Sequence, residues 1–255
     1  MFFGGIPCID SISSPLVRTR GLLYLILQTM ATLHHLPGEP ISEQLLWICA
    51  HCGRKPQLHS LSSPRHRRQV FHRTGSWRVP VVEEGSVAWP EPWDGASALL
   101  GESDLRNAYL GRPGPECDTV RSLYEQFRVL HESMLIVLAH EHERPDLPTL
   151  WLPLPPGAGD ARIRRWLTWR DHAQALEQAA ATVTEGLRAI TVHLKQRRTE
   201  AGDEWLITDR PTIVDAAYIC LINALGDTIP GRLGQAIGAV EDIKQLRRWA
   251  KKNQR

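Results

Sequence analysis

An apolar helix near the carboxyl end of the chain limits the fold more than any other feature of the sequence. Thr212 and Asp215, just behind Pro211, form a pattern typical of a helix start, because their side-chain oxygens accept hydrogen bonds from free backbone N–H groups. The residues that follow are apolar almost all round a helix: Ile213, Val214, Ala216, Ala217, Ile219, Cys220, Leu221 and Leu225. Such a helix must be buried in the centre of its domain. The sequence therefore predicts a helical domain built around this segment.

Further helices are predicted on both sides of this one. Between residues 120 and 138, apolar side chains recur at the i, i+3 and i+4 spacing of a helix. A second long helical stretch is expected over residues 161–196 and a terminal amphipathic helix over residues 242–251. A Gly- and Pro-containing linker at 111–115 precedes all of them. We therefore predict an all-helical domain over residues 112–255.

The chain before this linker has the pattern of a small α/β domain, predicted over residues 30–104. Pro40 suits the first turn of a helix, where its missing N–H costs nothing. Pro80 lies in an apolar strand, which requires a cis peptide bond and a missing N–H that faces away from the ladder. The expected elements are strands over 31–36 and 57–61, a helix over 40–53, a basic loop or short helix over 64–73, a hairpin of strands over 78–82 and 86–89 with a turn at 83–85, and a helix over 94–100.

Residues 1–29 have a different character from the rest. An apolar run over 21–33 follows Arg18 and Arg20, as in a signal peptide. It is shorter than the roughly 20 residues that span a membrane, and no small-residue cleavage site follows it. We expect residues 1–29 to be a disordered or non-native extension, with a targeting or membrane-contacting role as the alternative, and we expect no stable membrane span.

The net charge limits the class of binding partner, and the cysteine count indicates the cellular compartment. Thirty Lys and Arg residues against 28 Asp and Glu leave a net charge of +2, too small for a nucleic-acid binder that relies on phosphate contacts. The five cysteines are scattered along the chain, and an odd number leaves at least one of them unpaired, so they do not suit a disulfide framework. The sequence therefore predicts a cytoplasmic protein, because thiols stay reduced there.

Three segments resemble motifs of the glutathione S-transferase family. They are Val79-Pro80-Val81-Val82 with Gly85, then Trp89-Pro90-Glu91-Pro92, and finally the stretch from Trp205 to Asp215. The resemblance implies a thioredoxin-like domain that binds glutathione, followed by the helical bundle. It also implies that Val79 and Pro80 present backbone groups to the cysteinyl part of glutathione, and that Glu91 binds the γ-glutamyl ammonium. Pro92 stands where the family has a serine, so a hydroxyl and an N–H that hold a carboxylate are missing.

The catalytic position departs from the family further. Alignment of the helix that begins at Pro40 puts Glu39 where the family has Ser, Cys or Tyr, and a carboxylate beside a thiolate raises the pKa of the thiol. Ser42, one helical turn on, and His35, near the end of the first strand, are the predicted substitute donors.

Other clusters of reactive side chains have simpler interpretations. Cys49 and Cys52 fall near the end of their helix, where the dipole does not stabilise a thiolate, so we interpret them as core residues. The sequence over residues 140–143, His-Glu-His-Glu, lacks the spacing that places two imidazoles on one helical face, and we predict no metal site. The residues expected to line a substrate pocket or the core are Tyr124, Phe127, His131 and Trp166.

The resemblance implies an enzyme that conjugates glutathione, as co-substrate, to a small hydrophobic electrophile, and family members usually form homodimers. The Pro92 and Glu39 departures favour an alternative, a non-catalytic member of the fold that binds a ligand or a protein. A glutathione-dependent thiol reductase is a third hypothesis. The absence of a cysteine at the start of the helix counts against it.

Overall fold

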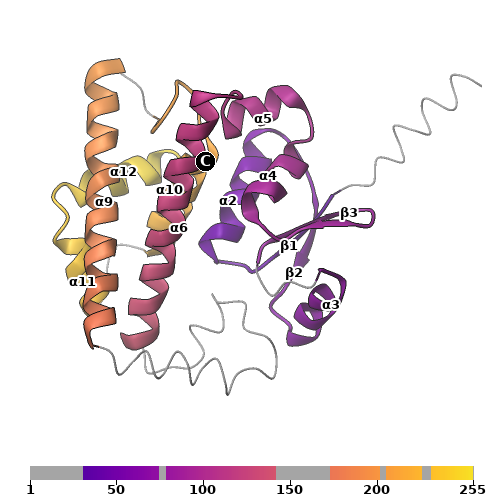
Figure 1. Ribbon diagram of the computed structural model, residues 1–255, viewed down its shortest axis with the longest axis horizontal. Coiled ribbons are helices and arrows are strands. Elements are labelled where there is room, and N and C mark those ends of the chain that lie inside the picture. The colour runs from indigo at the N-terminus through magenta and orange to yellow at the C-terminus, as the bar shows by residue number, and fades with distance from the viewer. Residues whose placement is uncertain (1–30, 75–78, 142–172, 202–204, 226–230, 255) are drawn as a thin grey trace, which may run out of the picture. The chain divides into compact units, whose positions relative to one another are not determined.

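A four-stranded sheet organises the first half of the chain in the computed structural model, which describes residues 31–74, 79–141, 173–201, 205–225 and 231–254 (Figure 1). The strands are β1 (Thr32–His35), β2 (Gln57–Ser60), β3 (Val81–Glu84) and β4 (Val87–Trp89). Their order is β2-β1-β3-β4, with β1 and β2 parallel and the other pairs antiparallel. The predicted extension at residues 1–29 lies outside the described residues.

Helices cover both faces of this sheet because successive side chains on a strand point to opposite sides. Leu33 and Val82, paired across β1 and β3, are fully buried in the large core with α2 (Pro40–His51) and α4 (Pro92–Leu100). Val81 faces the other way and packs with Val70 of α3 (Pro64–Thr74). The basic segment is therefore a helix that covers the second face of the sheet, which confirms the helical alternative.

The hairpin differs in register from the sequence prediction. β3 begins at Val81, not at residue 78, and Glu83 and Glu84 belong to the strand, not to the turn. The turn follows at Gly85, whose φ of 61° favours a residue without a Cβ. The next helix, α4, starts at Pro92, earlier than predicted, because a proline fits its first turn.

The remaining described helices include α10, the apolar helix predicted from the sequence. They are α5 (Ser103–Leu110), α6 (Pro115–Glu141), α9 (Ala173–Ala201), α10 (Ile213–Leu225), α11 (Gly231–Gly238) and α12 (Ile243–Lys252). α10 contacts α2, α6 and α12, so the large apolar core runs from the sheet into the bundle. Within the described residues, no helix combines the length and the apolar character needed to cross a membrane.

The start of α10 has the predicted capping geometry. The carboxylate of Asp215 accepts hydrogen bonds from the backbone N–H and the hydroxyl of Thr212, both at 2.8 Å, and from the N–H of Leu206 at 2.8 Å. Burial raises the pKa of Asp215 to about 6 against the effect of these bonds. Asp215 therefore joins the segment before α10 to the helix itself.

Candidate functional site

The first part of the predicted site lies where β3 begins. The Val79–Pro80 peptide bond is cis, as the sequence required. Pro80 is buried and Val79 half-buried, and pairing with β1 starts only at Val81. No backbone hydrogen bond joins Val79 to another described residue, so its N–H and C=O are not committed to the sheet.

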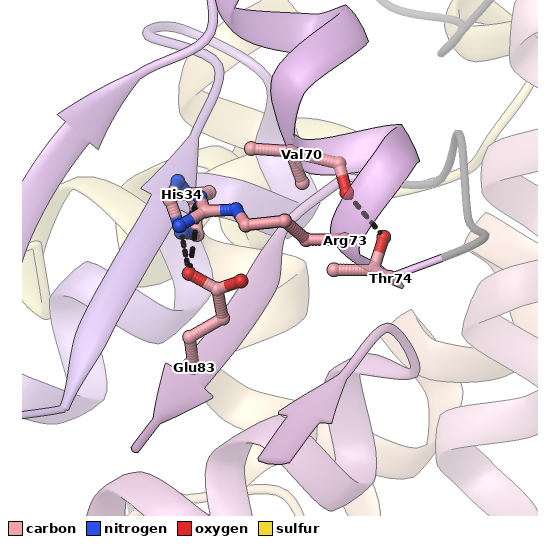
Figure 2. A network of polar contacts seen from close by, with 5 residues as sticks. All are labelled: His34, Val70, Arg73, Thr74 and Glu83. Carbon is pink, nitrogen blue, oxygen red and sulfur yellow. Dashed lines mark hydrogen bonds and ion pairs between the residues drawn. The ribbon is translucent and has the colours of Figure 1, made fainter. Parts of the chain in front are cut away.

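A polar network fixes the chain just before this point. Figure 2 shows Arg73, near the end of α3, pointing towards Glu83 of β3 and His34 of β1. Glu83 Oε2 lies 2.6 Å from His34 Nε2 and 3.2 Å from the Arg73 guanidinium. Burial lowers the pKa of His34, while Glu83 opposes that shift. The network joins α3 to two strands a few residues before Val79.

Glu91 and Pro92 form the start of α4. Pro92 is buried at the first helical position, and Glu91 is the N-cap residue, although its side chain makes no capping hydrogen bond. Arg128 of α6 lies beside this carboxylate, with Nη1 at 3.4 Å from Glu91 Oε2 and at 3.6 Å from Glu125 Oε2. A ligand ammonium that approached Glu91 would therefore compete with Arg128, which the sequence analysis did not identify.

Glu39 occupies the N-terminus of α2. Its carboxylate accepts hydrogen bonds from the backbone N–H of Ile41 at 2.9 Å and of Ser42 at 2.5 Å. These are the orphan donors that make a helix N-terminus an anion site. The chain therefore fills, with its own carboxylate, the position where the family resemblance places a reactive group.

The electrostatics around Glu39 follow from its burial. Only 1% of Glu39 is exposed, and desolvation raises its pKa to about 7 even though the helix N–H groups favour the charged form. His131 of α6 lies opposite, with Nε2 at 3.7 Å from Glu39 Oε1, and burial lowers its pKa to about 4. His131 Nε2 has no hydrogen-bond partner among the described residues. At neutral pH His131 is uncharged and Glu39 is only partly ionised, so this contact is not an ion pair.

The two predicted catalytic donors differ in their surroundings. Ser42 is fully buried, and its Oγ accepts a hydrogen bond from the backbone N–H of Leu36 at 3.1 Å, while the hydroxyl bonds to Glu39. His35 is half-buried, and its Nδ1 has no partner among the described residues. Burial lowers the pKa of His35. The unpartnered Nδ1 is itself buried, so neither Ser42 nor His35 Nδ1 is open to a ligand in this arrangement.

The candidate pocket residues on α6 lie in the core. Tyr124, Phe127 and His131 are at most 3% exposed, and their rings stack in sequence along the helix. The Tyr124 hydroxyl accepts a hydrogen bond from Gln44 Nε2 of α2 at 2.5 Å, and burial raises the pKa of this phenol. Trp166 lies outside the described residues. The sequence analysis did not identify Gln44. Its position as a polar residue beside the apolar residues of α2 could have indicated a buried hydrogen bond.

The cysteine pair has the structural role that the sequence indicated. Cys49 is buried in α2 and Cys52 is its C-cap, with Sγ donating to the carbonyl of Cys49. Burial raises the pKa of Cys49 to about 12, the opposite of what a redox thiol needs. The side chains of residues 140–143 are not among those described, and the described residues contain no metal-ligating group of three or more.

Comparison with known proteins shows a fold likeness without a sequence match. No protein-family profile matches the chain, and neither does any curated protein. A glutathione S-transferase from Rhodospirillum rubrum is 18% identical over 87% of this chain and 86% of its own, with a TM-score of 0.56. One from Methylobacillus flagellatus, solved with glutathione bound, is 10% identical over 88% and 92%, with a TM-score of 0.57. The nitrogen regulation fragment of the yeast prion protein Ure2p is 15% identical over 89% and 93%, with a TM-score of 0.58.

These similarities show that the chain has the glutathione transferase fold, a thioredoxin-like unit followed by helices. At such low sequence identity they establish the fold alone, so the chemistry of the site must be argued from the residues of this chain.

Proposed function

We propose that this glutathione transferase-like protein binds glutathione, or a related γ-glutamyl peptide, and does not activate its thiol. The observation that carries the proposal is the position of the Glu39 carboxylate on the backbone N–H groups of Ile41 and Ser42. A bound thiolate needs donors and positive potential at such a helix start. Here the donors are used, and the ionised carboxylate would repel the thiolate.

The remaining predicted contacts support ligand binding. The Val79 backbone is available to pair with an extended peptide, and the partly exposed Glu91 carboxylate can accept from an ammonium once Arg128 gives way. The Methylobacillus neighbour was solved with glutathione bound to this fold. The Ure2p neighbour has the same fold and is described as a nitrogen regulation fragment.

Conjugation of glutathione to a small hydrophobic electrophile is the second candidate function. The observation that favours it is the half-buried imidazole of His35, whose buried Nδ1 has no partner in the described part of the chain and would have to become exposed to donate to a sulfur. Ser42 supports conjugation less well, because its hydroxyl already contacts Leu36 and Glu39.

Calorimetric titration with glutathione and with S-methylglutathione tests the proposal. We expect similar affinities for the two, because no protein group is assigned to the sulfur, and no ultraviolet thiolate band at neutral pH. We also expect no conjugation of a generic aryl halide above the uncatalysed rate. A thiolate band together with turnover would establish the second candidate instead. Absence of binding to either ligand would overturn both.

The proposal includes a cytoplasmic homodimer with the domain boundaries predicted above. Four described cysteines are free thiols, which suits a reducing compartment. Light scattering measures the oligomeric state, and a monomer mass would contradict the dimer. Limited proteolysis tests the boundaries, with cleavage expected before residue 30 and at the exposed residues 112–114 between α5 and α6.

A further inference from the structure

Strand β2 and helix α3 form a surface that the proposed glutathione site does not use. The two elements lie side by side in Figure 1, and we call Leu58, His59, Ser60, Arg65, His66 and Arg68 the β2–α3 surface. Three features of this surface point to one kind of partner: its charge, its open strand edge and the alternation of its side chains.

The charge is concentrated on α3. This helix has no acidic residue and carries Arg65, His66, Arg67, Arg68, His72 and Arg73. Arg67 donates to the carbonyl of Leu61, and Arg73 pairs with Glu83. Arg65 and Arg68 are exposed, and neither has an ion-pair partner in the part of the chain that the structure describes. A chain with a net charge of +2 thus places unneutralised cations together on one short helix.

The open edge belongs to β2. Among the strands of the described residues this one ends the sheet, and all four of its residues are exposed. The backbone N–H of Gln57 donates to Ala31 and that of Leu61 donates to His35, so these positions face β1. By the alternation of a strand, the N–H and C=O groups of Leu58 and Ser60 point away from the sheet, where the C=O of Ser60 already accepts a hydrogen bond from His66. An edge of this kind pairs readily with another extended chain.

A hydrogen bond brings the cations to this edge. The carbonyl of Ser60 accepts from His66 Nδ1 at 3.3 Å, which holds the first turn of α3 against the outer side of β2. The His66 ring lies nearly parallel to that of His59, with an interplanar angle of 4° and centroids 5.9 Å apart. Arg65 is the neighbour of His66 in the same helical turn.

The two faces of β2 differ in chemistry. Leu58 pairs in register with buried Leu33, so it lies on the apolar face of the sheet, yet 51% of it is exposed. His59 pairs with His34 on the face that α3 covers. A strand added beside β2 would alternate between an apolar neighbour and a cationic one.

We propose that the β2–α3 surface binds an extended, acidic segment of a partner protein, added as a strand to the free edge of β2. Acidic side chains of the segment face Arg65 and Arg68, and the intervening apolar side chains cover Leu58. A nucleic acid would use the cations but not the outward N–H and C=O groups of Leu58, so an acidic peptide fits more of the surface.

Fluorescence anisotropy with the full chain and a labelled peptide of alternating glutamate and valine tests this proposal. We expect saturable binding that weakens with salt. The double variant R65E/R68E should lose at least about tenfold in affinity, as expected when two rim cations are reversed. The matched control R106E/R188E reverses two exposed arginines on α5 and α9 and should bind like the wild type.

Peptide variants test the strand geometry without any change to the protein. A peptide of alternating lysine and valine should not bind, and neither should the acidic peptide with N-methylated backbone amides on one edge. Equal binding of the N-methylated peptide would overturn strand addition, and equal binding of the lysine peptide would overturn the charge argument. Tighter binding of an oligothymidylate than of the acidic peptide would make the surface a nucleic-acid site. Loss of peptide binding as the chain self-associates would assign it to a second copy.

Discussion

The imidazole of His131 lies 3.7 Å from the carboxylate of Glu39, and both side chains are almost completely buried. Their pKa values are shifted in opposite directions by the same cause, the loss of water around each charged form. The pair joins α2 to α6 and makes the stability of the protein depend on pH in two opposing ways.

Replacement of Glu39 by Gln should remove one of these dependences. The folded-state pKa of Glu39 is raised from 4.5 to about 7, so the folded chain binds more protons and the free energy of unfolding falls as pH rises through that window. Linkage puts the loss on the order of 3 kcal/mol. Urea titrations between these pH values should therefore show that the free energy of unfolding of E39Q rises relative to that of the wild type as pH rises. The matched control E132Q, at an exposed position of α6, should follow the wild type. Parallel curves for E39Q and the wild type would contradict the assignment.

Replacement of His131 by Leu should have the reverse effect. The folded-state pKa of His131 is lowered from 6.5 to about 4, so the folded state binds fewer protons and stability is lost as pH falls through this range. H131L should lose less stability on acidification than the wild type, and at neutral pH it should unfold at higher urea, because an unpartnered buried nitrogen costs roughly 1 kcal/mol or more. H72L, at an exposed position, is the control. Greater acid sensitivity of H131L would refute this account.

Replacement of Asp215 by Ala should destabilise the helical half. The variant leaves the N–H groups of Leu206 and Thr212 without their acceptor in a buried place, and we expect a loss of roughly 3 kcal/mol. Asp209, exposed a few residues earlier, provides the control D209A, which should change stability by less than about 0.5 kcal/mol. Denaturant unfolding followed by tryptophan fluorescence measures both. Similar midpoints for the two variants would exclude the capping role.

Replacement of Arg128 by Gln tests the binding site. The guanidinium neutralises Glu91, so R128Q should bind glutathione roughly threefold to fivefold more tightly, which matches a partly exposed ion pair worth less than about 1 kcal/mol. E91Q should bind more weakly than the wild type, and R188Q, on an exposed face of α9, should bind equally. Calorimetry gives the three affinities. Weaker binding by R128Q would instead indicate that Arg128 contacts the ligand directly.

The fold followed from patterns that act over a few residues. The apolar stretch after Thr212 predicted a central helix, and its Asp215 cap predicted where that helix starts. Pro80 within a strand required a cis bond, and the structure contains it. The β3–β4 turn was placed too early because Glu83 and Glu84 look like turn residues, whereas Glu83 is held in the strand by its contacts with His34 and Arg73.

The candidate site followed from the sequence only in part. Pro40 at the first helical position makes Glu39 the N-cap, which is a local signal, but no pattern along the chain indicates that the Glu39 side chain is buried. The partners Arg128 and His131 come from a helix far along the chain, and no spacing rule connects them to Glu91 and Glu39.

The sequence by itself determined that the central helix and its cap exist and which faces are apolar, because periodicity and capping depend on neighbours along the chain. The tertiary structure decided whether the start of α2 is open to a ligand, since that depends on how α6 packs across it. Burial sets the charge state of Glu39, and burial is a property of the whole packed unit.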